Sequence, residues 1–302
     1  MIMKFLALIL AFVCLCSVVV AQQQADPEFD TSVARRAYKD DGPRVMFDEA
    51  HHNFHTTDGR YKPFVDLLMN DGYSVIRNRQ PFVKARLSGF KILVIANALG
   101  AEEYDDEGAD KSAFTDEEIA AVADWVKGGG ALLLIADHAP FGAAASGLSK
   151  RLGVDMSMGY TFDPKNSVAG SPSQLIFSRE NKLLSTHPIT EGRGENERIK
   201  IVRSFTGQAL KGPEGSVAIL SLSDSAYDSP SFDSGLSVSV AGWAQAVAMK
   251  FGKGRVVVQG EAAMLSAQIS GADKRTMGMN VPGNDNKQYA LNLIHWLSGI
   301  LK

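Results

Sequence analysis

Cysteine is almost absent from this sequence of 302 residues. Its two cysteines, Cys14 and Cys16, both lie in the apolar run Phe5–Val20 near the N-terminus. Lys4 precedes this run and Val19-Val20-Ala21 ends it, a pattern typical of a secretory signal cleaved after Ala21. Cleavage there leaves a mature chain without cysteine. That excludes disulfides, thiol catalysis and cysteine-based zinc sites in the mature protein.

We therefore expect a secreted or periplasmic protein without a membrane span after cleavage, and an uncleaved N-terminal anchor is the alternative. No convincing lipidation motif precedes either cysteine. We expect residues 1–21 to be the signal peptide, residues 22–42 a flexible arm, and residues 43–302 a single α/β domain. About 280 residues are enough for one large core.

An excess of positive charge is also missing. The formal net charge is −3, and it falls to −4 once Lys4 leaves with the signal peptide. Without a basic patch, nucleic-acid binding is excluded. The sequence contains no G-x-S-x-G, and Gly128-Gly129-Gly130 precedes a strand instead of following one. A standard α/β-hydrolase elbow and a phosphate-binding loop are therefore excluded as well.

The sequence does contain an alternation of strand and helix patterns. Strands are predicted over 44–47, 74–77, 91–97 and 131–136, and helices over 61–70, 82–87, 115–127 and about 143–152. Lys91–Asn97 and Ala131–Ala136 are nearly continuous apolar runs, as expected of parallel strands buried on both faces. Thr115 and Glu118 form a capping box. The alternation predicts an α/β fold with a flavodoxin-like, doubly wound, mainly parallel sheet and helices on both faces.

The second half of the chain is less regular, so we expect an elaboration there. The patterns predict strands over 174–178, 199–205 and 217–222, and a hairpin or adjacent strands at 244–251 and 254–259. Ser221–Ser239 is predicted to be a surface loop. The final helix is predicted over 288–301, capped by Asn284-Asp285-Asn286.

Polar side chains follow several predicted strands at the point where each strand ends. The densest group is Phe47–His55, which holds three of the six histidines. Because the carboxyl ends of parallel strands meet at one edge of a sheet, these side chains are expected to line a common crevice. The candidates are Asp48, Asp137, His138 and Glu261 as catalytic residues, Glu49, His52, Asn97, Asn284 and Asn286 as ligand-binding residues, and His51 and His55 as metal ligands.

Carboxylates and imidazoles from separate strands suit a divalent metal such as zinc, iron or manganese, and equally a metal-free acid/base pair. Each candidate also has a structural alternative. The histidines of 51–55 could bond to the backbone and to one another, and Asp48 and Asp137 could brace turns. His187 is expected to brace a turn, and His295 to be a satisfied core residue.

Several segments resemble the class I glutamine amidotransferase-like superfamily, in particular exported families of unknown function related to gliding-motility accessory and trehalose-utilisation-type proteins. The resemblance rests on the segments 45–51, 91–97, 115–142, 187–190, 252–258 and 284–296. In true amidotransferases a nucleophilic cysteine follows the strand that corresponds to Ala131–Ala136. Here Asp137-His138 stand in that turn, so the resemblance implies the fold and not glutaminase activity.

Together these patterns predict an exported protein with a small-molecule site at the strand carboxyl edge. The expected chemistry is a metal-assisted hydrolysis of a polar, sugar-like substrate. The alternative is a non-catalytic ligand-binding or scaffolding domain of the cell envelope. A third possibility is a module that docks an envelope protein partner through the acidic loop Ala101–Asp110.

Overall fold

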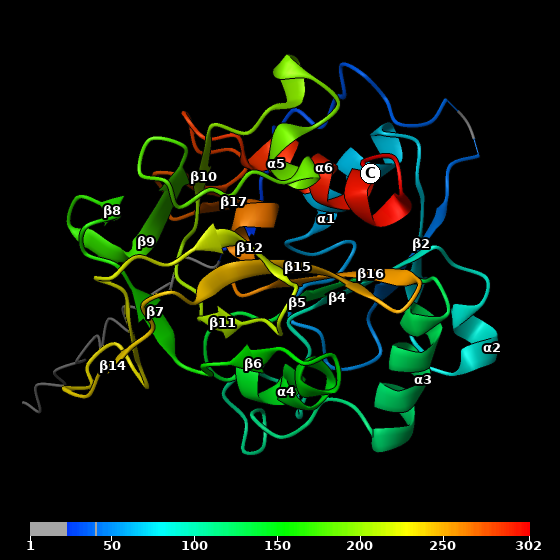
Figure 1. Ribbon diagram of the computed structural model, residues 1–302, viewed down its shortest axis with the longest axis horizontal. Helices are drawn as coiled ribbons and strands as arrows, with labels where there is room; N and C mark the ends of the chain where they lie inside the picture. The colour runs from blue at the N-terminus through cyan, green and yellow to red at the C-terminus, as the bar shows by residue number, and fades with distance from the viewer. Residues whose placement is uncertain (1–22, 40) are drawn as a thin grey trace, which may run out of the picture.

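The computed structural model describes residues 23–39 and 41–302 (Figure 1). The predicted signal peptide lies outside these residues. Within them, no helix has both the length and the apolar character needed to cross a membrane. The helices are α1 (Lys62–Asn70), α2 (Lys84–Leu87), α3 (Asp116–Lys127), α4 (Phe141–Arg151), α5 (Pro188–Glu191) and α6 (Asn286–Ser298), with 3-10 turns η1 (Glu195–Glu197) and η2 (Ala263–Leu265).

A nine-stranded mixed sheet forms the centre of the molecule. Its strands are β2 (Arg44–Asp48), β3 (Ser74–Asn78), β4 (Ile92–Ala96), β5 (Ala131–Ile135), β6 (Asp155–Met156), β11 (Leu210–Lys211), β12 (Val217–Ser221), β15 (Ala244–Phe251) and β16 (Gly254–Gln259). The order is β3-β2-β4-β5-β16-β15-β11-β6, and β12 also pairs with β15. Strands β3, β2, β4, β5 and β16 are parallel, and the remaining strands join antiparallel.

Three small antiparallel sheets elaborate the second half. They consist of β1 (Gln24–Ala25), β17 (Ala267–Ser270) and β18 (Arg275–Gly278); of β8 (Ser167–Val168), β9 (Ser171–Ser178) and β10 (Ile201–Arg203); and of β7 (Tyr160–Phe162), β13 (Tyr227–Ser229) and β14 (Val238–Ser239). The segment predicted to be a surface loop, Ser221–Ser239, therefore contains the two short strands β13 and β14.

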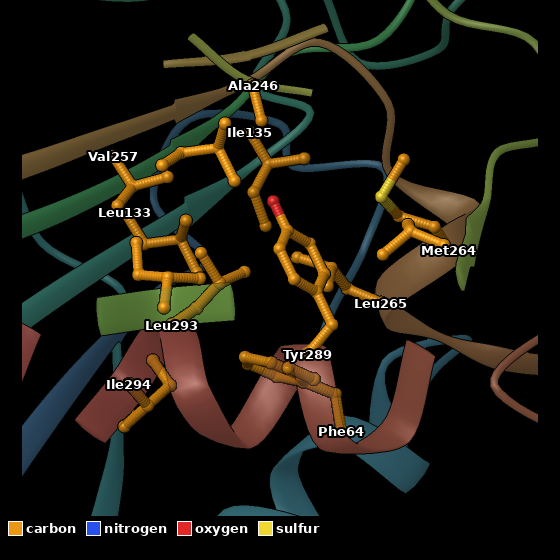
Figure 2. Close-up of a cluster of buried hydrophobic side chains, with 14 of the residues drawn as sticks. Phe64, Leu133, Ile135, Ala246, Val257, Met264, Leu265, Tyr289, Leu293 and Ile294 are labelled. Carbon is orange, nitrogen blue, oxygen red and sulfur yellow. The ribbon is translucent and has the colours of Figure 1, made fainter. Parts of the chain in front are cut away.

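Helices cover both faces of the main sheet, as Figure 1 shows for α1 and α6 on one side and α3 and α4 on the other. Alternate residues of the buried strands serve the two faces, because successive side chains of a strand point to opposite sides. Leu133 and Ile135 face α1 and α6, and Leu132 and Leu134 face α3 and α4. In Figure 2 the Tyr289 ring rises from α6 toward the strands, and its hydroxyl donates to Gln259 Oε1 at 3.1 Å. The sequence prediction of an α/β fold with helices on both faces is confirmed at this level.

The segment expected to be a flexible arm is instead packed against the domain, so that prediction was wrong. Among its described residues, Gln24 and Ala25 form β1, which pairs with β17. Phe29, Val33 and Tyr38 pack against the core. The amide of Ala37 donates to a carboxylate oxygen of Asp71 at 2.7 Å. The sequence did not predict these contacts, because the segment is polar and because the residues that it packs against lie far away in sequence.

Candidate functional site

The loop that follows β2 is organised around His51. Nδ1 of His51 lies 3.0 and 2.9 Å from the two carboxylate oxygens of Asp48, and Nε2 lies 2.8 Å from Oε1 of Glu118 on α3. The rings of Phe82 and Phe114 contact the imidazole, with centroids at 4.6 and 4.8 Å. Both ring nitrogens of His51 therefore face carboxylates inside an aromatic cage.

Two carboxylates on one imidazole favour its doubly protonated form, since both ring nitrogens then donate. Burial disfavours the charged ring, but the hydrogen bond and charge of Asp48, followed by those of Glu118, outweigh it and raise the pKa of His51. A metal ion bound by His51 would have to displace one of these carboxylates. The capping box predicted for Thr115 and Glu118 is confirmed, and Glu118 serves both the cap and His51.

His55, the second predicted metal ligand, lies apart from this network. It is buried, its ring stacks on Tyr61 at 4.5 Å, and its Nδ1 has no hydrogen-bond partner among the described residues. Burial, together with the charge of Arg60, lowers the pKa of His55 to about 3. His55 is therefore a neutral ring at physiological pH. Within residues 23–39 and 41–302 no cluster of three or more His, Cys, Asp or Glu side chains is arranged to hold a metal ion.

The turn after β5 places Asp137 and His138 at the sheet edge. Asp137 accepts the amides of His138 (2.8 Å) and Ala262 (3.2 Å), and its own amide donates to Asn97 Oδ1 (3.0 Å). Nδ1 of His138 lies 2.7 Å from the carbonyl oxygen of Ala139. This contact assigns the proton to Nδ1 and leaves the lone pair of the half-buried ring on Nε2. In this tautomer His138 thus presents an acceptor nitrogen, Nε2, at the sheet edge.

Glu261 follows β16 and is fully buried. Its two carboxylate oxygens accept the amides of Ala263 and Met264 at 2.7 and 2.8 Å. Burial, and then the charge of Asp137, raise the pKa of Glu261 well above its ordinary value, and burial also raises the pKa of Asp137. Two carboxyl groups in one buried region cannot both ionise freely. The structure brings Asp137 and Glu261 together, as predicted, but the backbone already uses their oxygens.

A groove of about 770 Å³ lies where the loops after β2 and β4 meet. We call it the strand-end groove. The first loop contributes Glu49, His52, Asn53 and Phe54, and the second contributes Leu99, Glu102 and Glu103. The two loops are tied together, because Phe54 N donates to Asn97 O and Leu99 N to His51 O. Two of the predicted ligand-binding residues, Glu49 and His52, line this groove.

The groove is mixed in polarity. Arg60 lies over the Phe54 ring at 4.2 Å, and its Nε donates to the carbonyl oxygen of Gln23. Glu49 is paired with Arg79 at 3.1 Å, whereas no salt bridge involves Glu102 or Glu103 among the described residues. Aromatic and acidic side chains therefore face the same space.

A row of contacting rings runs from the groove across the site. Phe54 contacts Phe141 (5.4 Å between centroids), Phe141 contacts His138 (6.1 Å), His138 stacks on Tyr160 (4.5 Å), and Tyr160 contacts Phe232 (4.9 Å). We call these five residues the aromatic row. It places His138 two rings away from the strand-end groove.

The Asn284–Asn286 segment does not act as predicted. Asp285 accepts the amides of Lys200 and Ile201, while Asn286 bonds to Arg203 and Met264 and is fully buried. No side chain caps the helix at Asp285. Asp285 and Asn286 thus clamp β10 to α6, whereas Asn284 donates to the carbonyl oxygens of Gly278 and Val281. The side chains of both candidates, Asn284 and Asn286, are therefore used by the backbone. His187 caps α5, as expected. His295 is a core residue, as expected, and its Nε2 bonds to Asp71 at 2.7 Å, but its buried Nδ1 has no hydrogen-bond partner among the described residues, so the ring is only half satisfied.

Sequence reasoning missed several residues of the site. Gln208 donates to the carbonyl oxygens of Ala136 and Asp137 at 2.8 and 2.9 Å and fixes the end of β5. Phe54 and Tyr160 were not singled out, although aromatic residues beside a candidate histidine are a usable signal. Glu102 and Glu103 were noted only as part of an acidic loop.

No family model and no curated protein matches this sequence. Solved structures do match. The mmIFT52 N-terminal domain matches with a TM-score of 0.59 and 14% identity over 85% of this chain and 97% of that one. A cytoplasmic protein, STM3548 from Salmonella typhimurium, has a TM-score of 0.51, 10% identity and coverage of 85% and 99%.

A ThuA-like protein from Parabacteroides merdae ATCC 43184 also matches, with a TM-score of 0.48, 12% identity and coverage of 86% and 91%. At these identities the likeness concerns the fold alone. The amidotransferase-like superfamily and its exported, gliding-motility-related branch therefore stay predictions from the sequence.

Proposed function

We propose that this chain is an exported α/β protein that binds a small polar molecule in the strand-end groove. The observation that carries the proposal is the position of the groove. β2 lies between β3 and β4, so the chain order reverses there. The loops that leave β2 and β4 line the groove, together with residues 23–25 of the N-terminal arm. In open α/β sheets, ligands bind at such a switch point.

The finer description of the fold belongs to the same proposal. The parallel strands stand in the order β3-β2-β4-β5-β16. We propose that this part is the flavodoxin-like, doubly wound unit and that β15, β11, β6 and β12 are additions to its edge. The proposal is supported by the helices on both faces and by a strand order of the flavodoxin-like type.

Ligand-observed NMR with a panel of sugars, sugar acids, amino sugars and amino acids tests the binding proposal. Glu102→Trp places a large side chain in the groove and is expected to abolish binding of any ligand found. Glu107→Trp is the matched control, because Glu107 is exposed on the same loop and does not line the groove. Binding that survives Glu102→Trp would place the ligand elsewhere.

A hydrolase is the second candidate, and the free Nε2 of His138 favours it. In this version His138 takes a proton from water, and the neighbouring Asp137 stabilises the imidazolium that forms. The substrate class carried over from the sequence is sugar-like and polar. We expect His138→Ala to abolish turnover while the thermal unfolding midpoint stays close to that of the parent protein. His187→Ala, which removes a histidine far from the site, is the control.

The metal-assisted form of this hydrolase requires a divalent metal held by His51 or His55. Elemental analysis of protein purified without affinity histidines tests it. Zinc, iron or manganese near one equivalent, lost in His51→Ala, would support the metal-assisted form. If the protein stays metal-free after incubation with each ion, the metal-assisted form is excluded. The remaining candidates are then the metal-free hydrolase and the non-catalytic binding protein.

A further inference from the structure

A second pocket, of about 470 Å³, lies between the start of β9 and the loop that follows β13. Its lining within the described chain consists of uncharged residues: aromatic rings, serine hydroxyls, one glutamine amide, a proline and a glycine. We call it the neutral pocket. It shares no lining residue with the strand-end groove. Its volume lies within the range of small-molecule sites.

Three aromatic rings form one wall of the neutral pocket. Phe162 and Tyr227 stack with centroids 5.2 Å apart and planes at 16°, and Phe232 stands edge-on to Phe162 at 5.6 Å. Phe162 is buried, but 57% of the surface of Phe232 is exposed. An aromatic ring held against other rings and open on one side offers a rigid apolar face to a ligand.

Hydroxyl and amide groups complete the lining. Ser229 Oγ lies 2.8 and 3.0 Å from the carbonyl oxygens of Ser231 and Leu236, which share its single proton. This contact fixes the loop base and leaves the lone pairs of Oγ to accept. Gln174 Oε1 accepts from Arg203 at 2.6 Å, which orients the amide and leaves its NH₂ group as a donor. The pocket therefore offers neutral donors and acceptors beside an aromatic face.

The absence of charge in this lining selects against charged ligands. A phosphate, carboxylate or ammonium group would gain no ionic partner from the lining itself, and the guanidinium of Arg203 behind the lining is engaged with Gln174 Oε1 at 2.6 Å. An aliphatic ligand would leave the amide and hydroxyl groups unpaired. A sugar ring satisfies both requirements, because it has an apolar C–H face and hydroxyl groups at its rim.

We propose that the neutral pocket binds an uncharged sugar residue, stacked against Phe232 and hydrogen-bonded by Ser229 and Gln174. This site is separate from the strand-end groove and does not depend on the function proposed for that groove. A single sugar residue held by one exposed ring binds weakly, with a Kd in the millimolar range.

Saturation-transfer NMR on the full chain tests the proposal with methyl glucoside, methyl galactoside, methyl mannoside, xylose and N-acetylglucosamine. Glucuronate and glucosamine serve as the charged counterparts. We expect at least one neutral sugar to bind, Phe232→Ala to weaken it about tenfold or more, and Phe232→Trp to retain it. Leu236→Ala is the matched control, since Leu236 is 72% exposed on the same loop and does not line the pocket.

Three results would overturn the proposal. They are no binding of any neutral sugar at millimolar concentration, equal binding to the parent protein and to Phe232→Ala, and equal binding of the neutral and charged sugars. Glu102→Trp separates this site from the strand-end groove, because it is expected to leave sugar binding at Phe232 unchanged. Circular dichroism of Phe232→Ala checks that the variant is folded.

Discussion

His51 binds two buried carboxylates at once, so its protonation is coupled to the folding of the chain. A predicted metal ligand thus has a clear structural role in the fold. The loop that His51 anchors carries His52, Asn53 and Phe54 into the strand-end groove. The loop that forms this wall of the groove is therefore held in place by the contacts of His51 with Asp48 and Glu118.

The first prediction concerns the pH dependence of stability. The folded-state pKa of His51 is raised above the unfolded value of about 6.5. Its stabilisation is therefore fully present below about pH 6.5 and is lost as the pH rises through the folded-state pKa. We expect the free energy of unfolding in urea to fall between neutral and alkaline pH. In His51→Gln this part of the decrease should disappear, and an unchanged pH profile would contradict the role given to His51.

Removing the imidazole should also be costly at neutral pH. His51→Leu leaves Asp48 and Glu118 buried without their shared partner, a change that typically costs about 3–5 kcal/mol. His52→Leu is the matched control, because His52 is exposed. Urea denaturation of both variants measures the difference, and similar midpoints for the two would argue against the network.

Glu261 should make the stability depend on pH above the ordinary carboxyl value. Burial raises its folded-state pKa, so the folded protein holds this proton more tightly than the unfolded chain does. Its contribution to stability is therefore lost as the pH rises from the ordinary carboxyl value, about 4.3, through the folded-state value. Calorimetric unfolding of the parent protein and of Glu261→Gln across this range should show a smaller pH slope in the variant.

At the scale of elements, Glu118 is part of two structures. It closes the capping box of α3 with Thr115 and also binds His51 and the amide of Phe82. Removing the Thr115 side chain should cost about 1 kcal/mol, the usual value of an N-cap. Glu118→Ala should cost clearly more, since it also leaves the buried imidazolium with one carboxylate. If both variants lose the same free energy of unfolding, Glu118 contributes only to the helix cap.

The N-terminal arm is a second element whose role can be measured. The amides of Ala37 and Tyr38 donate to the side chain and backbone of Asp71, and Asp71 in turn binds His295 on α6. We expect these two amides to exchange with deuterium far more slowly than those of an open loop. Rapid deuterium exchange of the Ala37 amide would instead support the flexible arm that the sequence predicted.

At the scale of the whole molecule, the sequence predicts the parallel core because the signal there is local. Runs such as Leu132–Ile135 are apolar on both faces, and the capping box of α3 lies within four residues. The small sheets were mostly missed because all of their strands except β9 are only two to four residues long and their partners are remote, as with β1 and β17. A pattern of side chains does not encode such pairings.

The candidate site was also predicted in its local features and missed in its long-range contacts. Strand ends locate Asp48, Asp137, His138 and Glu261 because topology brings those ends to one edge. Their partners come from elsewhere: Glu118 is 67 positions from His51, and Ala262 is 125 positions from Asp137. The sequence therefore predicts where polar groups gather but not which of them the backbone already uses.

The aromatic row has a thermodynamic consequence. Phe54 lines the strand-end groove, Phe232 lines the neutral pocket, and three further rings connect them. If a ligand in the groove changes the packing of these rings, it changes the affinity of the neutral pocket. Linkage then requires that a sugar at Phe232 change the affinity of the groove by the same factor. Each site would report the occupancy of the other, and His138 stands midway between them.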